Sequence, residues 1–123
     1  MSLKKDKYNN KDKLYMNLAL KLASARHGLT GPNPSVGCVI VKKDQIISIG
    51  QTGFGGRPHA EYNAIKSSHE NLKGSKMYVT LEPCNHYGKT PPCTDIIVSN
   101  KIKKVFYGIE DIDLKVKVKH LKF

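Results

Sequence analysis

Apolar residues recur at helical spacing in the first third of the chain. Intervals of three and four residues separate Leu14, Leu18, Leu22 and Ala25. This spacing places the four side chains on one face of a helix. Asp12 is of a type that caps helix N-termini, and Gly28 is of a type that ends helices. We therefore expect an amphipathic helix over residues 12–28.

Short apolar runs after this helix have the composition of strands. The first two, residues 36–41 and 46–49, are separated by polar residues and predict a hairpin. Two further strands are predicted over residues 76–81 and 104–109. Two further helices are predicted over residues 59–70 and 94–99. This order of elements predicts an α/β fold, in which helices pack on a mixed sheet.

The length of the chain, 123 residues, fits one domain. We expect the folded domain to span residues 11–113, after a flexible basic N-terminus over residues 1–10. Residues 114–123 alternate lysine with apolar residues and predict a basic tail or an edge strand. No apolar run approaches the roughly 20 residues that a membrane span needs. The first residues lack the apolar core of a signal peptide, so we expect a cytoplasmic protein without a membrane partner.

The formal net charge of the chain is +11, which bears on the kind of partner that it could bind. Lysines crowd both ends of the sequence, and solvated termini are the simplest explanation for them. An excess of positive charge also suits an anionic partner, either a nucleic acid or a phosphorylated metabolite. Charge alone leaves these alternatives open.

Two short motifs carry candidate chemistry. His59 and Glu61 form a His-x-Glu motif at the start of a predicted helix, and Cys84 and Cys93 each follow a proline. His-x-Glu followed by Pro-Cys and a further cysteine is the signature of zinc nucleobase deaminases. A catalytic zinc ion has three protein ligands and an open position for water, and one imidazole with two thiolates supplies the three. The pattern predicts Zn²⁺ as the cofactor, held by His59, Cys84 and Cys93.

Glu61 is the predicted proton carrier. Its position two residues after His59 places a carboxylate beside the metal without making it a ligand. Zinc lowers the pKa of bound water from about 15.7 to near 7. A nearby carboxylate can take the proton of that water and deliver protons to a ring nitrogen and to the leaving amine. The alternative is a structural zinc site closed by His86, whereas Cys38 lies in an apolar run and is expected to be an inert buried thiol.

The residues around these motifs resemble a known family. The segments GPNPSVGCVIV, GRPHAEYNAI and YVTLEPCNHYGKTPPC are similar to the deaminase domains of bacterial riboflavin-biosynthesis proteins of the RibD group. The similarity covers residues 16–111, most of the chain. Related deaminases acting on tRNA adenosine, cytidine or guanine have a shorter PCxxC loop. The resemblance implies a three-layer α/β/α sandwich with a mixed central sheet, of the cytidine-deaminase kind.

The resemblance also implies a reaction and roles for individual residues. The family deaminates 2,5-diamino-6-(5-phosphoribosylamino)pyrimidin-4(3H)-one: water replaces the ring 2-amino group and ammonia leaves. The same His, two Cys and Glu are implied as zinc ligands and proton carrier. We expect Asn33 at the ribose or ring edge and His86 at the pyrimidine or phosphate arm, with turn and loop-packing roles as the alternatives. Lys89 is the candidate for the 5′-phosphate, because lysine supplies a point charge.

Members of this family often carry an NADPH-dependent reductase domain after the deaminase. This sequence shows no such domain, so we expect either a stand-alone deaminase with a separate reductase or a truncated chain. Deaminases of this fold usually self-associate, which predicts a homo-oligomer. A deaminase of tRNA adenosine or another nucleobase and an inactive zinc-stabilised binding module are the alternative functions. The long loop between the cysteines argues against nucleic acid as the partner.

Overall fold

The computed structural model describes residues 8–81, 83 and 92–108, together with the backbone of residues 115–118. Five strands form one sheet in the order β2-β1-β3-β4-β5. Their bounds are β1 Gly37–Lys42, β2 Gln45–Gln51, β3 Lys76–Val79, β4 Lys104–Tyr107 and β5 Lys115–Val118. Strands β3 and β4 are parallel and the other neighbours are antiparallel, so the predicted mixed sheet is confirmed.

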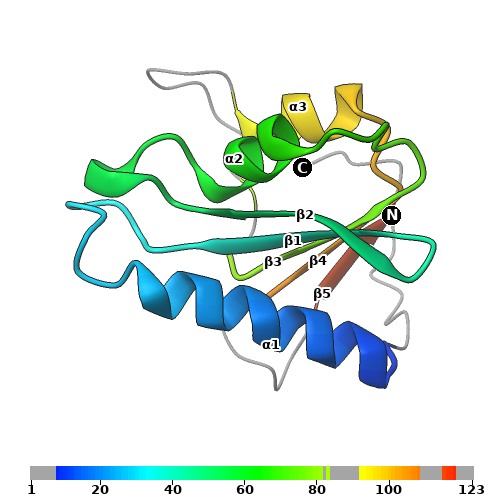
Figure 1. Cartoon of the computed structure of the whole chain (residues 1–123), viewed down its shortest axis with the longest axis horizontal. Coiled ribbons are helices and arrows are strands. Elements are labelled where there is room, and N and C mark those ends of the chain that lie inside the picture. Colours follow the sequence, from blue (N-terminus) through cyan, green and yellow to red (C-terminus); the bar gives the residue numbers. More distant parts are fainter. Residues whose placement is uncertain (1–7, 82, 84–91, 109–114, 119–123) are drawn as a thin grey trace.

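Helices cover both faces of this sheet (Figure 1). Helix α1, Asn10–Ala25, lies on one face, whereas α2, Ala60–Ser67, and α3, Cys93–Ser99, lie on the other. A one-turn 3-10 helix, η1, spans Phe54–Gly56 in the connection between β2 and α2. The predicted three-layer α/β/α sandwich is therefore confirmed. Within the described residues, no helix is long and apolar enough to cross a membrane.

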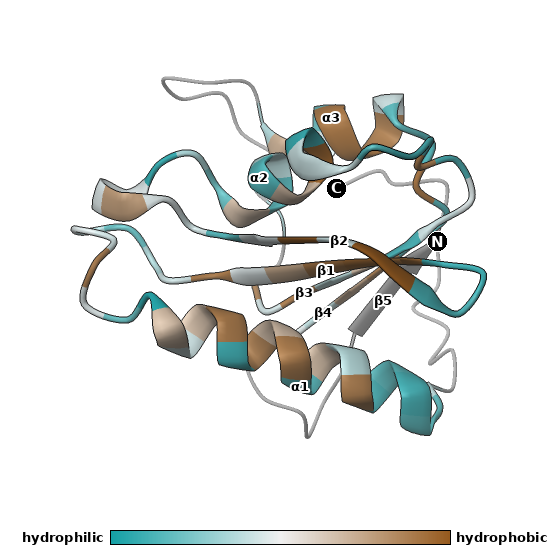
Figure 2. Cartoon of the chain, in the orientation of Figure 1, coloured by the Kyte–Doolittle hydropathy of each residue, from teal (hydrophilic) through white to brown (hydrophobic). Residues whose placement is uncertain are grey.

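Strand β1 is apolar and buried from Gly37 to Val41, because both of its faces are covered there. Val39 and Val41 pack with the cluster beneath α1, while Cys38 and Ile40 pack with the cluster beneath α2 and α3. Figure 2 shows this hydrophobic band along β1 and β2, between the helical layers. The prediction that Cys38 is a buried thiol is confirmed, and burial raises its pKa well above the usual range.

The start of α1 differs from the prediction. Asn9, not Asp12, is the N-cap: the Asn9 side chain accepts a hydrogen bond from the Asp12 amide at 2.9 Å. The Asp12 carboxylate accepts one in return from the Asn9 amide at 2.8 Å, which completes a capping box. The buried Asp12 side chain also accepts a 2.5 Å hydrogen bond from the Tyr78 hydroxyl on β3. Asp12 thus joins the helix to the sheet.

We expect Tyr78→Phe to destabilise the fold by about 2 kcal/mol, because it leaves a buried carboxylate oxygen without its donor. Burial and the bond to Asp12 raise the pKa of Tyr78 well above its usual range, so the hydroxyl donates throughout the working pH range. Urea unfolding measures the loss. Tyr15→Phe is the control, because the Tyr15 hydroxyl donates only to a backbone carbonyl, of Asp44 at 3.3 Å. Equal losses in the two variants would contradict the special role of Asp12.

Other boundaries shift without changing the architecture. Helix α2 ends at Ser67, three residues before the predicted end, because the backbone of Ser68 is extended. Residues 115–118 form strand β5 at the sheet edge, antiparallel to β4.

One close approach fixes α2 on the sheet. A Cβ atom built on Gly50 of β2 would lie 2.3 Å from the carbonyl oxygen of Ala60 and 2.5 Å from the amide nitrogen of Ala64. Real Cβ atoms essentially never come this near to backbone. Only glycine at this position allows the first turns of α2 to rest on β2.

Candidate active site

The N-terminus of α2 positions the His-x-Glu motif. His59 is the N-cap of this helix and Glu61 lies in its first turn. The loop that leads into His59 is tied back to the helix by Asn63, whose side-chain amide donates to the carbonyl oxygens of Gln51 at 2.7 Å and Pro58 at 3.2 Å. The backbone amide of Asn63 donates to the His59 carbonyl at 3.0 Å. Asn63 therefore holds both the end of β2 and the residue before His59.

The N-terminus of α3 brings Cys93 to the same place. Cys93 is the first residue of α3 and is buried, and its Sγ lies 3.4 Å from Nδ1 of His59. Zinc bonds to sulfur are about 2.3 Å long and those to imidazole nitrogen about 2.0–2.1 Å, so two ligand atoms on a tetrahedral zinc ion lie about 3.5 Å apart. The observed separation fits a shared zinc ion.

Glu61 completes the described part of the site. Its side chain is 4% exposed, and a hydrogen bond joins its carboxyl group to the Cys93 side chain. Burial raises the pKa of this carboxyl to about 7, although its hydrogen bonds to its own backbone and to Cys93 act in the opposite direction. A carboxyl group whose pKa lies near neutrality can both accept and release a proton at working pH.

The structure brings together three of the predicted site residues, His59, Glu61 and Cys93. The third predicted ligand, Cys84, lies outside the described residues, as do His86 and Lys89. Within the part of the chain that is described, no three His, Cys, Asp or Glu side chains are grouped so that they could hold a metal ion. The complete ligand set and the contacts of the loop therefore stay predictions.

Asn33 lies in the loop after α1, next to the loop that leads to α2. Its side-chain amide donates to the Gly56 carbonyl at 3.0 Å, and its own carbonyl accepts from the Thr30 hydroxyl at 2.6 Å. The Gly55 amide adds a 2.9 Å bond to the Leu29 carbonyl. Asn33 thus links the loop after α1 to the loop before α2 by a hydrogen bond. Its contact with substrate stays a prediction.

Sequence reasoning missed Asn63. The only local signal is its spacing: it lies four residues after His59 and so one helical turn along the same face. The two carbonyl groups that it binds belong to the preceding strand and loop, which no local pattern indicates.

Asn63→Asp should weaken zinc binding by about tenfold, the lower end of the effect of residues that support metal ligands. The carboxylate would face the carbonyl oxygens of Gln51 and Pro58 without a proton to donate, and the loop before His59 would move. Competition with a chromogenic chelator measures the affinity. Ser67→Ala is the matched control, because Ser67 binds the β2 carbonyl of Ile49 from the far end of α2. The same loss in the control would mean that Asn63 supports only the fold.

Comparisons with known proteins agree with this geometry. Residues 9–109 match the model of the cytidine and deoxycytidylate deaminase zinc-binding region. The chain is 48% identical over 106 residues to the diaminohydroxyphosphoribosylamino-pyrimidine deaminase of Buchnera aphidicola (subsp. Schizaphis graminum), covering 86% of this chain and 72% of that protein. It is 53% identical over 100 residues to the riboflavin biosynthesis protein RibD of Aquifex aeolicus, covering 81% of this chain and 28% of the relative. The chain thus spans less than a third of that protein.

Solved structures show the same architecture. A diaminohydroxyphosphoribosylaminopyrimidine deaminase/5-amino-6-(5-phosphoribosylamino)uracil reductase from Thermotoga maritima superposes with a TM-score of 0.76 at 46% identity, covering 80% of this chain and 29% of that one. The dCMP deaminase of cyanophage S-TIM5 superposes with a TM-score of 0.65 at 25% identity, covering 87% and 90%. The Thermotoga maritima protein is therefore similar to this chain in both sequence and fold.

Proposed function

This chain belongs to the family of cytidine and deoxycytidylate deaminase zinc-binding domains, and from that premise we propose that it hydrolyses the 2-amino group of 2,5-diamino-6-(5-phosphoribosylamino)pyrimidin-4(3H)-one, with release of ammonia. The observation that carries the proposal is the meeting of Cys93 with both His59 and Glu61. It occurs in a chain 48% identical to a protein named as this pyrimidine deaminase. The substrate and the product follow from that likeness.

The described donor atoms suit zinc. His59 offers an imidazole nitrogen and Cys93 a thiol sulfur at a ligand-like separation, and Cys84 is the proposed third ligand. When bound, zinc supplies a water molecule acidified to a pKa near 7 and leaves one position open for it. The protein places these donors at the starts of two helices that pack on the same face of the sheet.

Glu61 is proposed to carry protons between water and substrate. The buried carboxylate accepts a proton from the attacking water and passes it to the ring nitrogen beside the 2-amino group. Glu61 then takes the remaining proton from the added hydroxyl group and gives it to the departing nitrogen, so that the C–N bond breaks, ammonia leaves and a ring carbonyl group remains. Burial of Glu61 limits exchange of these protons with solvent.

Substrate recognition is proposed to involve Asn33, His86 and Lys89. Asn33 lies in a loop bonded to the one that precedes His59, which supports a place for it at the rim of the site. The phosphate of the substrate needs a cation, and Lys89 is the proposed one.

Lys89→Ala should raise the KM for the phosphorylated substrate by about 10- to 100-fold, the effect of losing one charge-assisted hydrogen bond. The KM for the dephosphorylated substrate should stay the same, because the phosphate is the group that Lys89 is proposed to bind. Steady-state ammonia release with both substrates measures the difference. Equal losses would place Lys89 elsewhere.

A product assay tests the proposed function. The zinc-loaded protein should release ammonia from the pyrimidine phosphate, and a chelator should stop the reaction until zinc is restored. Deamination of adenosine in a tRNA anticodon stem-loop, without activity on the pyrimidine, would replace the proposal with a nucleic-acid deaminase. A zinc-binding protein that releases ammonia from neither substrate would fit a binding module.

The reaction product also needs a consumer. The Thermotoga maritima relative is named as both a deaminase and a reductase, so we propose that a reductase acts on the product, either in the same polypeptide or as a separate protein. We further propose that the domain self-associates, and sedimentation analysis of the purified protein tests this.

A further inference from the structure

Lysines gather at the end of the sheet opposite the candidate active site. Strand β3 ends at Val79 next to the start of β1, on the active-site side, and begins at Lys76 on the other side. The four residues of β3 therefore separate the two ends by roughly 10 Å of strand. We call the far end the basic pole. Its lysines are Lys11, Lys42, Lys43, Lys73, Lys76, Lys101, Lys103 and Lys104.

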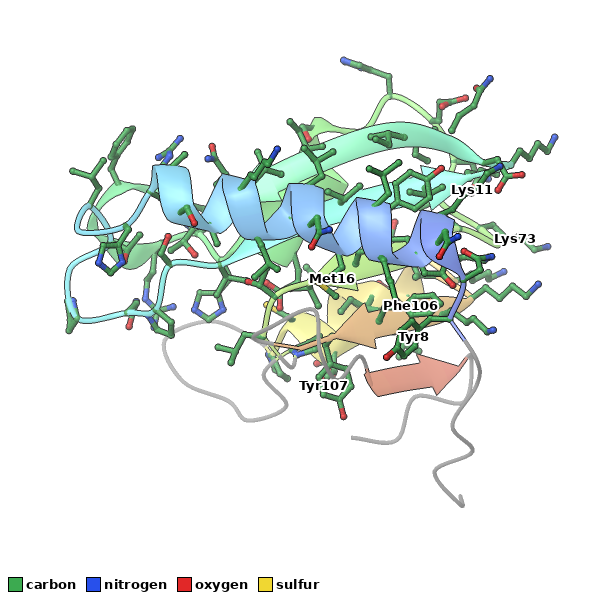
Figure 3. The ribbon with its side chains drawn as sticks, turned by 90° about the horizontal axis from the view of Figure 1, so that it is seen from below. Tyr8, Lys11, Met16, Lys73, Phe106 and Tyr107 are labelled. Atoms are coloured by element: carbon green, nitrogen blue, oxygen red, sulfur yellow. The ribbon has the colours of Figure 1, made fainter. Side chains whose placement is uncertain are left out.

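The topology explains why these lysines meet. The β1–β2 hairpin turns at Lys43 and Asp44, both in the left-handed backbone region, and β3 and β4 begin beside it. The two loops that precede β3 and β4 are joined by bonds from the Gly74 amide to the Lys101 carbonyl and from the Lys103 amide to the Ser75 carbonyl. Figure 3 shows Lys11 of α1 and Lys73 at this same end of the molecule.

A polar cavity of about 230 Å³ opens within the basic pole. Its lining includes Lys11, Lys43, Lys76, Lys103, Tyr15 and Tyr78. The volume lies below the roughly 300–1,000 Å³ of pockets for drug-sized ligands, so the cavity suits a small ligand. Lys76 lies two residues before Tyr78 on β3, so both side chains share the face of the sheet that α1 covers.

The two carboxylates that line the cavity already have partners. Asp12 is buried and bonded to the Tyr78 hydroxyl, and Asp44 pairs with Lys11 at 3.6 Å. Lys43, Lys76 and Lys103 have no carboxylate within salt-bridge distance among the residues that the structure describes. Three like charges around one cavity repel each other, and a bound anion would relieve that repulsion.

We propose that this cavity binds the phosphate group of a small anion. A phosphate group offers several acceptor oxygens for the lysine ammonium groups. It also carries the negative charge that would balance the three lysines. The ligand is either inorganic phosphate or a phosphomonoester, whose phosphate would sit in the cavity while its remainder extends into solvent. The site is separate from that of the proposed substrate, because it lies at the opposite end of β3.

Residue-resolved titration of the zinc-loaded protein tests this proposal. Inorganic phosphate and ribose 5-phosphate are added in separate NMR titrations. A third titration with sodium chloride at the same ionic strength is the control. The amides of Gly74 and Lys103 should shift with saturation, and the ligand that binds more tightly identifies the source of the phosphate. Shifts confined to the loop around Gly56 and His59 would assign phosphate to the active site and overturn the proposal.

A matched pair of triple variants separates a pocket from general charge. Replacing Lys43, Lys76 and Lys103 with Gln should weaken phosphate binding at Gly74 by about tenfold or more, the least that losing one charge-assisted hydrogen bond predicts. The control replaces Lys13, Lys21 and Lys66 with Gln, which removes the same charge outside the cavity. Equal weakening in the control, or no saturable shift in the unmodified protein, would show that the lysines only raise the surface potential.

Discussion

Glu61→Gln should lower the turnover of the zinc-loaded protein by about 10²- to 10⁴-fold, the usual contribution of a positioned acid–base group. Glutamine keeps the size of the side chain and can still bond to Cys93, but it cannot carry a proton. Zinc content and the unfolding midpoint should stay close to those of the unmodified protein, because Glu61 is not a proposed ligand. Coupled-enzyme detection of ammonia measures the turnover, and elemental analysis measures the zinc.

The control for this experiment is Glu70→Gln. Glu70 is an exposed carboxylate shortly after α2, so the same chemical change there should leave turnover unaltered. Ammonia release at the normal rate from the Glu61 variant would remove this residue from the mechanism. Loss of zinc together with turnover would instead mean that Glu61 supports the metal site.

Gly50→Ala should disrupt both the fold and the metal site. The new methyl group would lie 2.3 Å from the Ala60 carbonyl oxygen, so α2 must move away from β2. Overpacking in a well-packed interior costs about 1–3 kcal/mol and occasionally more, and we expect about 3 kcal/mol here because the obstacle is backbone. Because α2 carries His59 and Glu61, we expect reduced zinc content in the fraction that folds.

Gly28→Ala separates this effect from the loss of a glycine as such. Gly28 has a φ of 82° and no atom within 4 Å of an added Cβ, so the substitution costs only the left-handed backbone term of about 1–2 kcal/mol. Zinc content should stay unchanged in this variant. A Gly50→Ala protein that retains full zinc and normal stability would show that α2 is free to shift on the sheet.

Local patterns predicted most of the elements and the reaction type. Two short apolar runs separated by polar residues indicated the hairpin, and the His-x-Glu motif indicated where a metal site begins. The N-cap of α1 was missed because Asn9 and Asp12 are both good caps, and the difference lies in Tyr78, 66 residues further along the chain. A buried partner at that distance leaves no trace in a local window.

The same reason explains the two larger omissions. Asn63 acts through carbonyl groups of Gln51 and Pro58, and the identity of a residue says nothing about which backbone atoms it will reach. The excess lysine was ascribed to solvated termini, yet several lysines come together only because the hairpin turn and two strand starts share one end of the sheet. Composition left an anionic partner open as one alternative and did not indicate where on the fold such a partner could bind.

The parallel pairing of β3 with β4 has an evolutionary consequence. A parallel connection must cross over the sheet, and here α3 makes that crossing. The chain between Pro83 and Pro92 thus belongs to the connection from the end of β3 at Val79 to the start of α3 at Cys93. Natural selection can lengthen, shorten or exchange it without altering strand register, so one ancestral scaffold can diversify into enzymes for different substrates.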